Sequence, residues 1–528
     1  MTDLAGLARL TRDLPGFLRT AVTVDQAIEV VRRRLATREQ RFSRMVEQAI
    51  YGHPRSPYLA LLRAAGCELG DLKPLVARDG LEGALSRLRE AGVYVTFDEF
   101  KGRREVVRGS QRFTFADRDF DNPHVSAHVE ARSGGTRGPG TSVKISLPFV
   151  TDLAVDTALA FHAHGLSGYD HVLWLQGGFG ALVPTLLYAK LGRPPHAWLY
   201  PLQPLPAKAH LGARYLAVLS RLLGRPLPTP VFADLQDPAS LVLRLAGRRR
   251  EGAFLCVTTY ASGAVRIAAA AGQRGLRLDG VCFITLGEPF TEAKQRIVEA
   301  SGARALVRYA FTEAGIIGYR CGTPRLSDDL HFFSDSYGLV QRPRAVGDGG
   351  PVVDAFLFTS LLASAPKVLL NVESGDHGVV ERTSCGCGLG TVGLTTHLAR
   401  IRSFEKLSSE GMTFVQTDLL RVLEEVLPAR FGGTGTDYQL LEEEGEDGIL
   451  RLFLLVSPGV GPVDEAGVCQ TLLEELARGG GFAPLGAGMW RRAGTVVVRR
   501  QRLITTRAGK ILPFHLARAG ESSGSRGD

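Results

Sequence analysis

GVCFITLGEP (residues 280–289) and ALVRYAFTEAG (residues 305–315) are the two stretches that decide the fold. Each contains an apolar run of strand length, at 280–286 and at 305–309, and each run is followed by glycine, acidic or hydroxyl residues. A helical pattern at 291–300 separates the two runs, and strands joined through a helix are parallel. Because ligands bind at the carboxyl ends of parallel strands, we expect the polar residues after both runs to meet in one site.

The same alternation extends outward from these two stretches. Apolar runs predict further strands at 172–175, 196–200 and 254–258, and helical patterns predict helices at 182–191, 207–223, 238–248 and 262–274. Strands that alternate with helices of this length indicate an α/β fold. We therefore expect a large N-terminal domain with mostly parallel sheets covered by helices.

The flanking regions predict three further units. Residues 1–100 read as a helical segment that packs on the large domain, for which we expect the bounds 101–400. After a change of pattern near Ile401, helices at 417–426 and 467–478 and strands at 450–456 and 494–500 predict a small, mobile α+β lid domain over 401–519. The Ser-, Gly- and Arg-rich residues 520–528 predict a disordered tail.

Composition limits the classes of partner and the compartment. The net charge of +9 is spread along the 528 residues, which suits acidic partners such as ATP, coenzyme A or an acidic carrier protein rather than nucleic acid. The longest uncharged stretch, 172–189, contains Gln176 and Pro184 and predicts a buried strand and helix, so no membrane span is expected. Seven scattered cysteines and a charged N-terminal stretch predict reduced thiols and a cytoplasmic protein.

Three more segments have residue types that suit a nucleotide. The loop RSGGTRGPGTS (132–142) offers backbone N–H groups, hydroxyls and one arginine to phosphates, although such a loop is often only a loop. It lacks the Lys-Ser/Thr pair of a P-loop. The segment ESGDHG (373–378) could bind ribose hydroxyls through its aspartate or form an ordinary turn, and TRAGKI (506–511) presents a lysine on a glycine turn.

The order of these segments resembles the adenylate-forming superfamily, which contains acyl-CoA synthetases, peptide-synthetase adenylation domains and luciferases. The similarity is strongest to the phenylacetate–CoA ligase and acyl-protein synthetase branch, and it runs from about Ser56 to Pro513. The segments that look like the motifs of that family are Ser133–Pro139, Gly287–Pro289, Tyr309–Glu313, Gly375–Asp376, Ile401–Arg402 and Gly509–Lys510.

The resemblance implies a role for each matching residue. Thr312 would contact the α-phosphate, Glu313 would hold Mg²⁺, and Lys510 would stabilise the anionic centre formed when a carboxylate attacks ATP. The residues that would bind the rest of the nucleotide are Ser133, Gly134, Gly135 and Thr136 for the phosphates, Gly287, Glu288, Pro289 and Tyr309 for adenine, and Asp376 and Arg402 for ribose. The implied reaction converts an acid and ATP to acyl-AMP and pyrophosphate, followed by transfer to a thiol.

Some positions depart from the pattern of the family. Arg137 stands where the loop usually has glycine, Gly140 stands near a position that is lysine in many members, and Ala310 replaces a glycine. At the hinge, Glu405 is the only acid among residues 402–406. In the family this hinge lets the small domain take two orientations, one for each half-reaction, so these departures bear on the phosphate loop and on the rotation.

Four residues have the composition of a zinc site. Cys321, His331, Cys385 and Cys387 together offer three thiols and one imidazole, the donor set of a closed tetrahedral site, and Gly386 permits the tight Cys-x-Cys turn. Four unrelated buried groups are the alternative. Members of the phenylacetate–CoA ligase branch have a similar arrangement with bound zinc, which implies a structural role here.

The sequence says less about the carboxylic acid substrate and the acyl acceptor than about the nucleotide. Aromatic residues would surround an acid pocket and favour an aryl or apolar acid, although the same residues could be core: Trp174, Gly178, Trp198, Tyr200, Tyr260 and Phe311. Coenzyme A, a carrier protein or an amine could accept the acyl group, and a non-catalytic binding protein is an alternative of another class. The run GGFG (177–180) follows a strand but lacks the GxGxxG pattern of a dinucleotide site.

Overall fold

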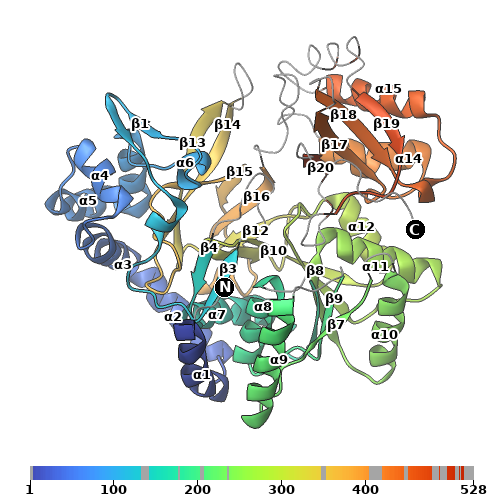
Figure 1. Ribbon diagram of the computed structural model, residues 1–528, viewed down its shortest axis with the longest axis horizontal. Coiled ribbons are helices and arrows are strands. Elements are labelled where there is room, and N and C mark those ends of the chain that lie inside the picture. The colour runs from blue at the N-terminus through green and yellow to red at the C-terminus, as the bar shows by residue number, and fades with distance from the viewer. Residues whose placement is uncertain are drawn as a thin grey trace.

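The computed structural model describes residues 4–132, 142–175, 179–201, 207–234, 237–345, 352–403, 419–444, 450–478, 487, 491, 496–505, 511 and 513–516. Within these residues a 12-stranded sheet forms the centre of the large domain, and a 4-stranded sheet forms a smaller domain near the C-terminus (Figure 1). The chain is therefore α/β with a second, smaller α+β unit, as the sequence predicts.

The parallel half of the large sheet has the strand order β10-β9-β8-β5-β6-β7. These strands are β5 (Asp170–Trp174), β6 (Ala197–Tyr200), β7 (Pro230–Phe232), β8 (Leu255–Tyr260), β9 (Val281–Leu286) and β10 (Arg304–Phe311). The helices between them are α8 (Phe179–Lys190), α9 (Ala207–Leu222), α10 (Pro238–Arg250), α11 (Ala261–Gln273) and α12 (Glu292–Ala300). Each predicted strand and helix of this region is confirmed to within a few residues.

Helices cover both faces of these parallel strands (Figure 1). Residues of α8, α9 and α7 (Leu147–Ala163) pack in one hydrophobic cluster, and residues of α10, α11 and α12 pack in another. Strand β8 has the burial pattern of a strand covered on both sides, because every one of its side chains from Leu255 to Tyr260 is buried. The prediction of a sheet covered by helices is confirmed here.

The other half of the large sheet is antiparallel, which the sequence patterns did not indicate. Its strands are β11 (Gly315–Arg320), β12 (Leu330–Phe332), β13 (Tyr337–Ala345), β14 (Val352–Ser360), β15 (Val372–Arg382) and β16 (Thr396–Ser403), with the 3₁₀ turn η3 (Gly390–Val392) before β16. The connection between β10 and β11 is only residues 312–314. A turn this short cannot carry a crossover, so the chain reverses direction there.

Helices dominate the first hundred residues: α1 (Leu4–Arg19), α2 (Val24–Ala36), α3 (Arg38–Met45), the π-helix η1 (Val46–Tyr51), α4 (Pro57–Ala64), α5 (Leu69–Glu90) and α6 (Phe97–Phe100). A buried ion-pair cluster ties them to the large domain, because the Arg34 guanidinium lies 3.4 Å from the carboxylates of both Asp156 and Asp335. The chain then forms β1 (Val106–Arg108), β2 (Gln111–Phe113), η2 (Asp117–Phe120), β3 (Val129–Arg132) and β4 (Ser142–Ile145).

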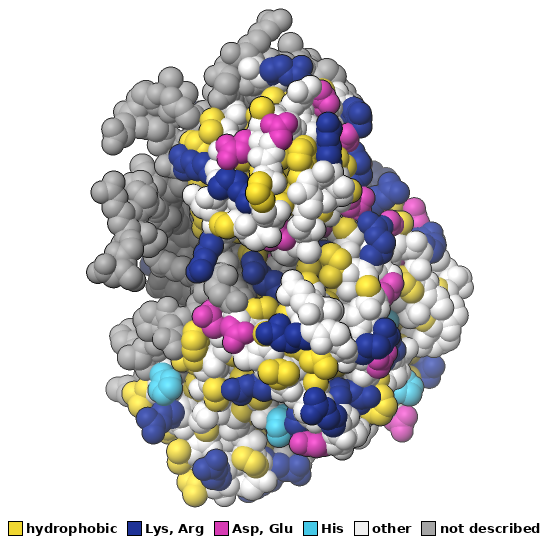
Figure 2. Space-filling view, turned by 90° about the vertical axis from the view of Figure 1, so that its right-hand side faces the viewer, with side chains coloured by type: hydrophobic (Ala, Val, Ile, Leu, Met, Phe, Trp, Pro, Cys, Tyr) yellow, Lys and Arg dark blue, Asp and Glu magenta, His cyan; other side chains and the backbone are white. Residues whose placement is uncertain are grey.

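The smaller domain has its own hydrophobic cluster. Its sheet has the order β19-β18-β17-β20, from strands β17 (Tyr438–Glu444), β18 (Leu450–Val456), β19 (Val496–Arg500) and β20 (Phe514–Leu516). Its helices are α13 (Leu419–Arg421), η4 (Val422–Val426), α14 (Leu427–Phe431), η5 (Pro458–Val460) and α15 (Glu465–Ala477). In the view of Figure 2, basic and acidic side chains are interspersed over the visible surface of the molecule.

Among the described helices, none has the length and apolarity required to cross a membrane.

Candidate active site

The turn between β10 and β11 presents Thr312 and Glu313 at the carboxyl end of a parallel strand. The register of the two strands shifts between Tyr309 and Ala310, and pairing resumes at Ala310 opposite Ile316 and continues to Phe311 opposite Gly315. Gly315 has a φ of +92°, and a Cβ there would meet the Phe149 ring at 2.7 Å, so only glycine fits. The close packing of the turn leaves Glu313 only 7% exposed.

Tyr309 and Asp376 come together from distant parts of the sequence. The Tyr309 hydroxyl donates to Asp376 Oδ2 at 2.7 Å. Burial and the neighbouring carboxylate raise the pKa of Tyr309 well above its ordinary value, so the phenol remains the proton donor. Asp376 follows Gly375, whose φ is +81°, and its backbone N–H bonds to Ser374 Oγ at 3.3 Å. Two of the segments assigned to nucleotide binding therefore meet.

Arg402 lies on the strand beside Asp376. Strands β15 and β16 pair His377 with Arg402 and Asp376 with Ser403, and Ser403 Oγ donates to the Gly375 carbonyl at 3.1 Å. The Arg402 guanidinium bonds to Asp328 at 3.0 Å. The sheet thus brings the proposed ribose-binding pair onto neighbouring strands, and Asp328 is a partner of Arg402 that the sequence analysis missed.

Gly287–Pro289 lies at the carboxyl end of β9, next to β10. The Glu288 carboxylate accepts hydrogen bonds from Ser262 N at 2.7 Å and from Ser262 Oγ at 2.9 Å, which places the acid at the N-terminus of α11. An acid in this position is stabilised by the helix dipole. The Pro289 carbonyl accepts from Lys294 Nζ at 2.8 Å. These contacts give Glu288 a structural function in holding α11 against the turn.

Lys101 is a residue of this site that the sequence analysis missed. It follows α6 and donates a hydrogen bond to Glu313, and its ammonium lies 5.3 Å from the centre of the Phe97 ring and 5.5 Å from that of Phe100. The pair is largely buried, with 12% of the Lys101 side chain and 9% of the Glu313 side chain exposed. The local signal is a capping box from Thr96 to Glu99, which predicts a helix that starts at Phe97, and in the structure this helix ends at Phe100, next to the lysine.

The aromatic residues assigned to an acid pocket do not form one lining. Trp174 pairs laterally with Leu199, whereas Trp198 pairs with Leu173, so the two indoles project from opposite faces of the sheet into different hydrophobic clusters. Trp174 Nε1 donates to the Ala233 carbonyl at 3.1 Å. The structure instead groups Phe311 with Tyr309 and Phe358, whose ring centres lie 6.3 and 5.4 Å from that of Phe311.

Tyr200 and Tyr260, the other two aromatic candidates, also lie apart from each other. Tyr200 packs on Phe232 with ring centres 5.6 Å apart, and Tyr260 is buried beside Glu288, whose charge adds to the effect of burial in raising the pKa of Tyr260. Residues singled out from the sequence that lie outside the described residues include Ser133, Gly134, Gly135, Thr136, Gly178, Glu405 and Lys510. The strands that flank the glycine-rich loop pair Arg132 with Ser142.

The cysteines and the histidine of the predicted zinc site converge on one point. His331 Nε2 lies 3.0 Å from Cys387 Sγ and 3.3 Å from Cys385 Sγ, and the Cys321 sulfur lies 3.7 Å from that of Cys385 and 3.9 Å from that of Cys387. Donors bound to one tetrahedral zinc at about 2.0 to 2.3 Å are separated by similar distances. Hydrogen bonds from Cys321 and His331 lower the pKa of the Cys387 thiol, which favours the thiolate that binds metal.

His397 joins this cluster, although the sequence analysis missed it. It pairs with His331 across β12 and β16, and a donor atom of His397 lies within 4.8 Å of those of Cys321, His331 and Cys385. His397 Nδ1 bonds to Asp329 at 2.7 Å, and among the described residues its buried Nε2 has no hydrogen-bond partner. His331 Nδ1 bonds to the Leu394 carbonyl at 2.7 Å, a contact that leaves Nε2 for the metal.

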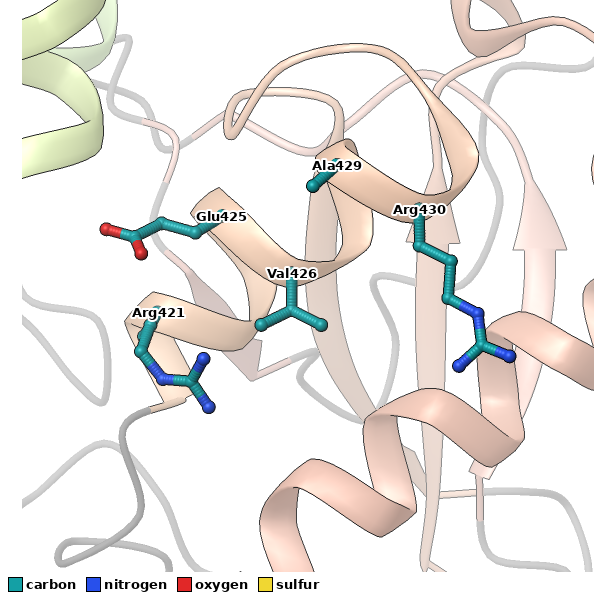
Figure 3. Close-up of a pocket in the computed structure, with 5 residues that line it drawn as sticks. All are labelled: Arg421, Glu425, Val426, Ala429 and Arg430. Carbon is teal, nitrogen blue, oxygen red and sulfur yellow. The ribbon is translucent and has the colours of Figure 1, made fainter.

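A separate hollow of about 570 Å³ lies on the smaller domain, bordered by Arg421, Glu425, Val426, Ala429 and Arg430 (Figure 3). Its polar side chains do not converge, because Glu425 extends away from Arg430 in Figure 3 and lies 3.6 Å from Arg296 of α12. Arg421 bonds to Glu475 of the same domain. This hollow contains none of the residues that the motifs identify, so the candidate site remains the end of β9 and β10.

Comparison with known proteins gives matches among solved structures alone, since no family model and no curated protein matches the chain. The structure of 2-hydroxyisobutyryl-CoA ligase in the postadenylation state in complex with 2-HIB-AMP aligns with a TM-score of 0.53 and 15% identity, over 95% of this chain and 91% of that chain. An open conformation of the same ligase with 2-HIB-AMP and CoA gives a TM-score of 0.46 at 15% identity, over 96% and 92%.

The amide bond synthetase McbA from Marinactinospora thermotolerans gives a TM-score of 0.40 at 12% identity, over 94% of this chain and 97% of that chain. The two scores below 0.5 add nothing to the first alignment, which covers both the large sheet and the smaller domain. That alignment shows that the chain shares its fold with 2-hydroxyisobutyryl-CoA ligase.

Proposed function

We propose that this protein activates a carboxylic acid with ATP, releases pyrophosphate and transfers the acyl group from the acyl-adenylate to a thiol. The single observation that carries the proposal is the hydrogen bond of 2.7 Å between Tyr309 and Asp376. It joins an aromatic ring at the end of a parallel strand to a carboxylate suited to a ribose diol, next to a turn that carries Thr312 and Glu313. Adenine, ribose and a metal-bound phosphate need these chemical groups in this order.

The proposed chemistry depends on charge. Attack of a carboxylate on the α-phosphorus creates a crowded anionic centre, so a cation must lie close to it. In the proposal Glu313 holds Mg²⁺, Thr312 bonds to the α-phosphate, and Lys510 supplies a positive charge during adenylation. Asp376 binds the ribose hydroxyls with Arg402 alongside, and Tyr309 with Gly287–Pro289 encloses adenine. Gly287–Pro289 directly follows β9 and Thr312 and Glu313 directly follow β10, and the hydrogen bond from Tyr309 brings Asp376 of β15 to the same place, which supports these assignments.

The acid is proposed to be apolar or aromatic. The rings of Tyr309, Phe311 and Phe358 lie within 6.3 Å of one another beside the Thr312 turn, which supports an apolar environment there. The acceptor is proposed to be the thiol of coenzyme A or of an acidic carrier protein. An amine acceptor remains the alternative that the assay below distinguishes.

We also propose one structural zinc bound by Cys321, His331, Cys385 and Cys387. The sulfur and nitrogen distances of 3.0 to 3.9 Å support this donor set. Four protein donors leave no open position, so the metal would join β11, β12 and the segment before β16 and would take no part in the reaction.

A pyrophosphate-release screen tests the proposed function. Purified protein is incubated with Mg²⁺-ATP and panels of aryl, fatty and amino acids, first alone and then with coenzyme A or an amine. Release that depends on one class of acid, with formation of AMP, is the expected result. The variant Lys510→Ala should lower adenylation by a factor on the order of 100, since it removes one charge donor from the transition state. Nucleotide binding without pyrophosphate release for any acid would favour a binding protein instead.

A further inference from the structure

We infer that Lys101 is a polyphosphate-binding residue. When Mg²⁺ binds, the Lys101 ammonium moves from Glu313 to the β- and γ-phosphates of the nucleotide. This inference rests on the proposed function and extends it to a residue outside every motif described above. Its basis is the buried pair of Lys101 with Glu313 at the end of β10, with 12% and 9% of the two side chains exposed.

Lys101 would need a second anionic partner once Mg²⁺ binds to Glu313. Lys101 and a Mg²⁺ ion would both use the carboxylate of Glu313, and a divalent cation takes precedence over an ammonium there. A buried ammonium that loses its partner is strongly unfavourable, so Lys101 needs another anion close by. The metal brings that anion with it, because Mg²⁺ at such sites is bound by one or two carboxylates and by the phosphates of the substrate.

The surroundings restrict where the ammonium can go. The centres of the Phe97 and Phe100 rings lie 5.3 and 5.5 Å from it, within the range of a cation–π contact. Directly after the lysine, Gly102 has a φ of +66°, and a Cβ there would meet the Phe115 carbonyl at 2.9 Å. Lys101 is thus held between a short helix and a turn that requires glycine, and the ammonium can move only locally.

The same scaffold also holds the base of the glycine-rich loop. Phe100 packs on Phe120 of η2 with ring centres 4.7 Å apart. In that segment the Asp117 carboxylate accepts from the backbone N–H of Ser142 at 3.3 Å, at the start of β4 and directly after the loop. Lys101, Glu313 and the base of the loop proposed for phosphate binding are therefore linked through contacts in one small region.

The chain offers a matched control in Lys144. This lysine lies on β4 near the same loop, but its side chain is 43% exposed and pairs with Asp121 at 3.1 Å. Its contacts involve neither Glu313 nor the Phe97 and Phe100 rings. The replacement Lys144→Met removes one positive charge from the region without altering the buried pair.

The experiment measures binding of ATP, ADP and AMP by calorimetry, each with Mg²⁺, to the wild type and to Lys101→Met, Lys101→Arg and Lys144→Met. Loss of a charge-assisted phosphate contact should weaken ATP binding about 10- to 100-fold in Lys101→Met and ADP binding less, while AMP binding stays within about twofold. Lys101→Arg should recover part of the ATP affinity, and Lys144→Met should resemble the wild type.

A phosphate-binding role of Lys101 predicts an affinity loss that grows with the number of phosphates on the nucleotide, whereas a structural role predicts the same loss for ATP and AMP. Equal weakening of ATP and AMP in Lys101→Met, or unchanged ATP affinity, would overturn the inference while leaving the proposed function intact. Failure of the wild-type protein to bind ATP would overturn both. If Lys101→Met does not fold, Lys101→Gln gives the same comparison, since it also removes the positive charge, and an unchanged ratio of ATP to AMP affinity in that variant contradicts a direct phosphate contact.

Discussion

The Glu424 carboxylate of the smaller domain lies 2.6 Å from the Lys294 ammonium of the large domain, and both side chains are at most 6% exposed. The Thr291 hydroxyl also donates to Glu424, and Lys294 donates to the Pro289 carbonyl at 2.8 Å. The contact between α12 and η4 is therefore attached directly to the Gly287–Pro289 segment. The position of the smaller domain and the shape of the proposed adenine site are linked through one buried ion pair.

Breaking this pair should release the smaller domain. Glu424→Ala leaves the Lys294 ammonium buried with only a carbonyl partner, a change that costs about 3 to 5 kcal/mol when the group cannot reach water. Undocking hydrates the lysine, so we expect a larger radius of gyration in X-ray scattering and an earlier, separate melting step of the smaller domain. Arg296→Ala is the control, because Arg296 is 64% exposed and its pair with Glu425 at 3.6 Å should contribute less than about 1 kcal/mol.

In the variant Asp376→Ala, the affinity for the nucleotide should no longer depend on the ribose hydroxyls. A carboxylate that accepts from both hydroxyls contributes charge-assisted hydrogen bonds of about 1.5 to 3 kcal/mol each. ATP should therefore bind at least 10-fold less tightly to the variant, whereas 2′-deoxy-ATP should be affected less than ATP. Titration of both nucleotides gives the comparison. An equal loss for both would assign Asp376 to holding Tyr309 rather than to binding ribose.

Metal analysis of protein purified without chelators should give about one zinc per chain. The double variant Cys385→Ser with Cys387→Ser should contain none and should melt at a lower temperature, because the metal joins strands that are distant in the sequence. His397→Gln should keep the metal if the four predicted donors are sufficient. Wild-type protein without metal would contradict the site, and loss of zinc in His397→Gln would make His397 a ligand.

The stability of the large domain should depend on the protonation of His171. This side chain stacks with both Tyr188 and Phe161, with ring centres 4.1 and 5.4 Å away, and burial lowers its pKa from 6.5 to about 3. The unfolded chain binds the proton more readily, so this contribution to stability is complete above pH 6.5 and is lost as the pH falls towards 3. The loss should reach up to about 4 kcal/mol over that range.

The variant His171→Phe keeps the stacked ring and cannot take up the proton. Urea unfolding between pH 7 and pH 4 should therefore show a smaller decrease in the free energy of unfolding for the variant than for the wild type. His210→Gln, at an exposed position on α9, should follow the wild type throughout. Parallel curves for His171→Phe and the wild type would assign the acid sensitivity to other groups.

Much of the parallel half of the sheet could be predicted from the sequence, because apolar runs and helical periods are local patterns. The predicted strands at 280–286 and 305–309 correspond to Val281–Leu286 and Arg304–Phe311. The antiparallel strands β11 to β16 were missed, since their pairing depends on turns and on partners far along the chain. The cysteine motif contained enough information to group Cys385 with Cys387, whereas His397 had no comparable local signal.

The sequence by itself determined the chemistry available to this protein: which segments end in glycine, acid and hydroxyl, and which thiols and imidazole could hold a metal. These are properties of residue type and spacing. The tertiary structure alone decided the partners, because pairing across 212 residues for Lys101 and Glu313 and across 67 residues for Tyr309 and Asp376 follows from sheet order and not from local propensity. For the same reason Trp174 and Trp198 lie on opposite faces, since the register of two neighbouring strands sets the direction of each side chain.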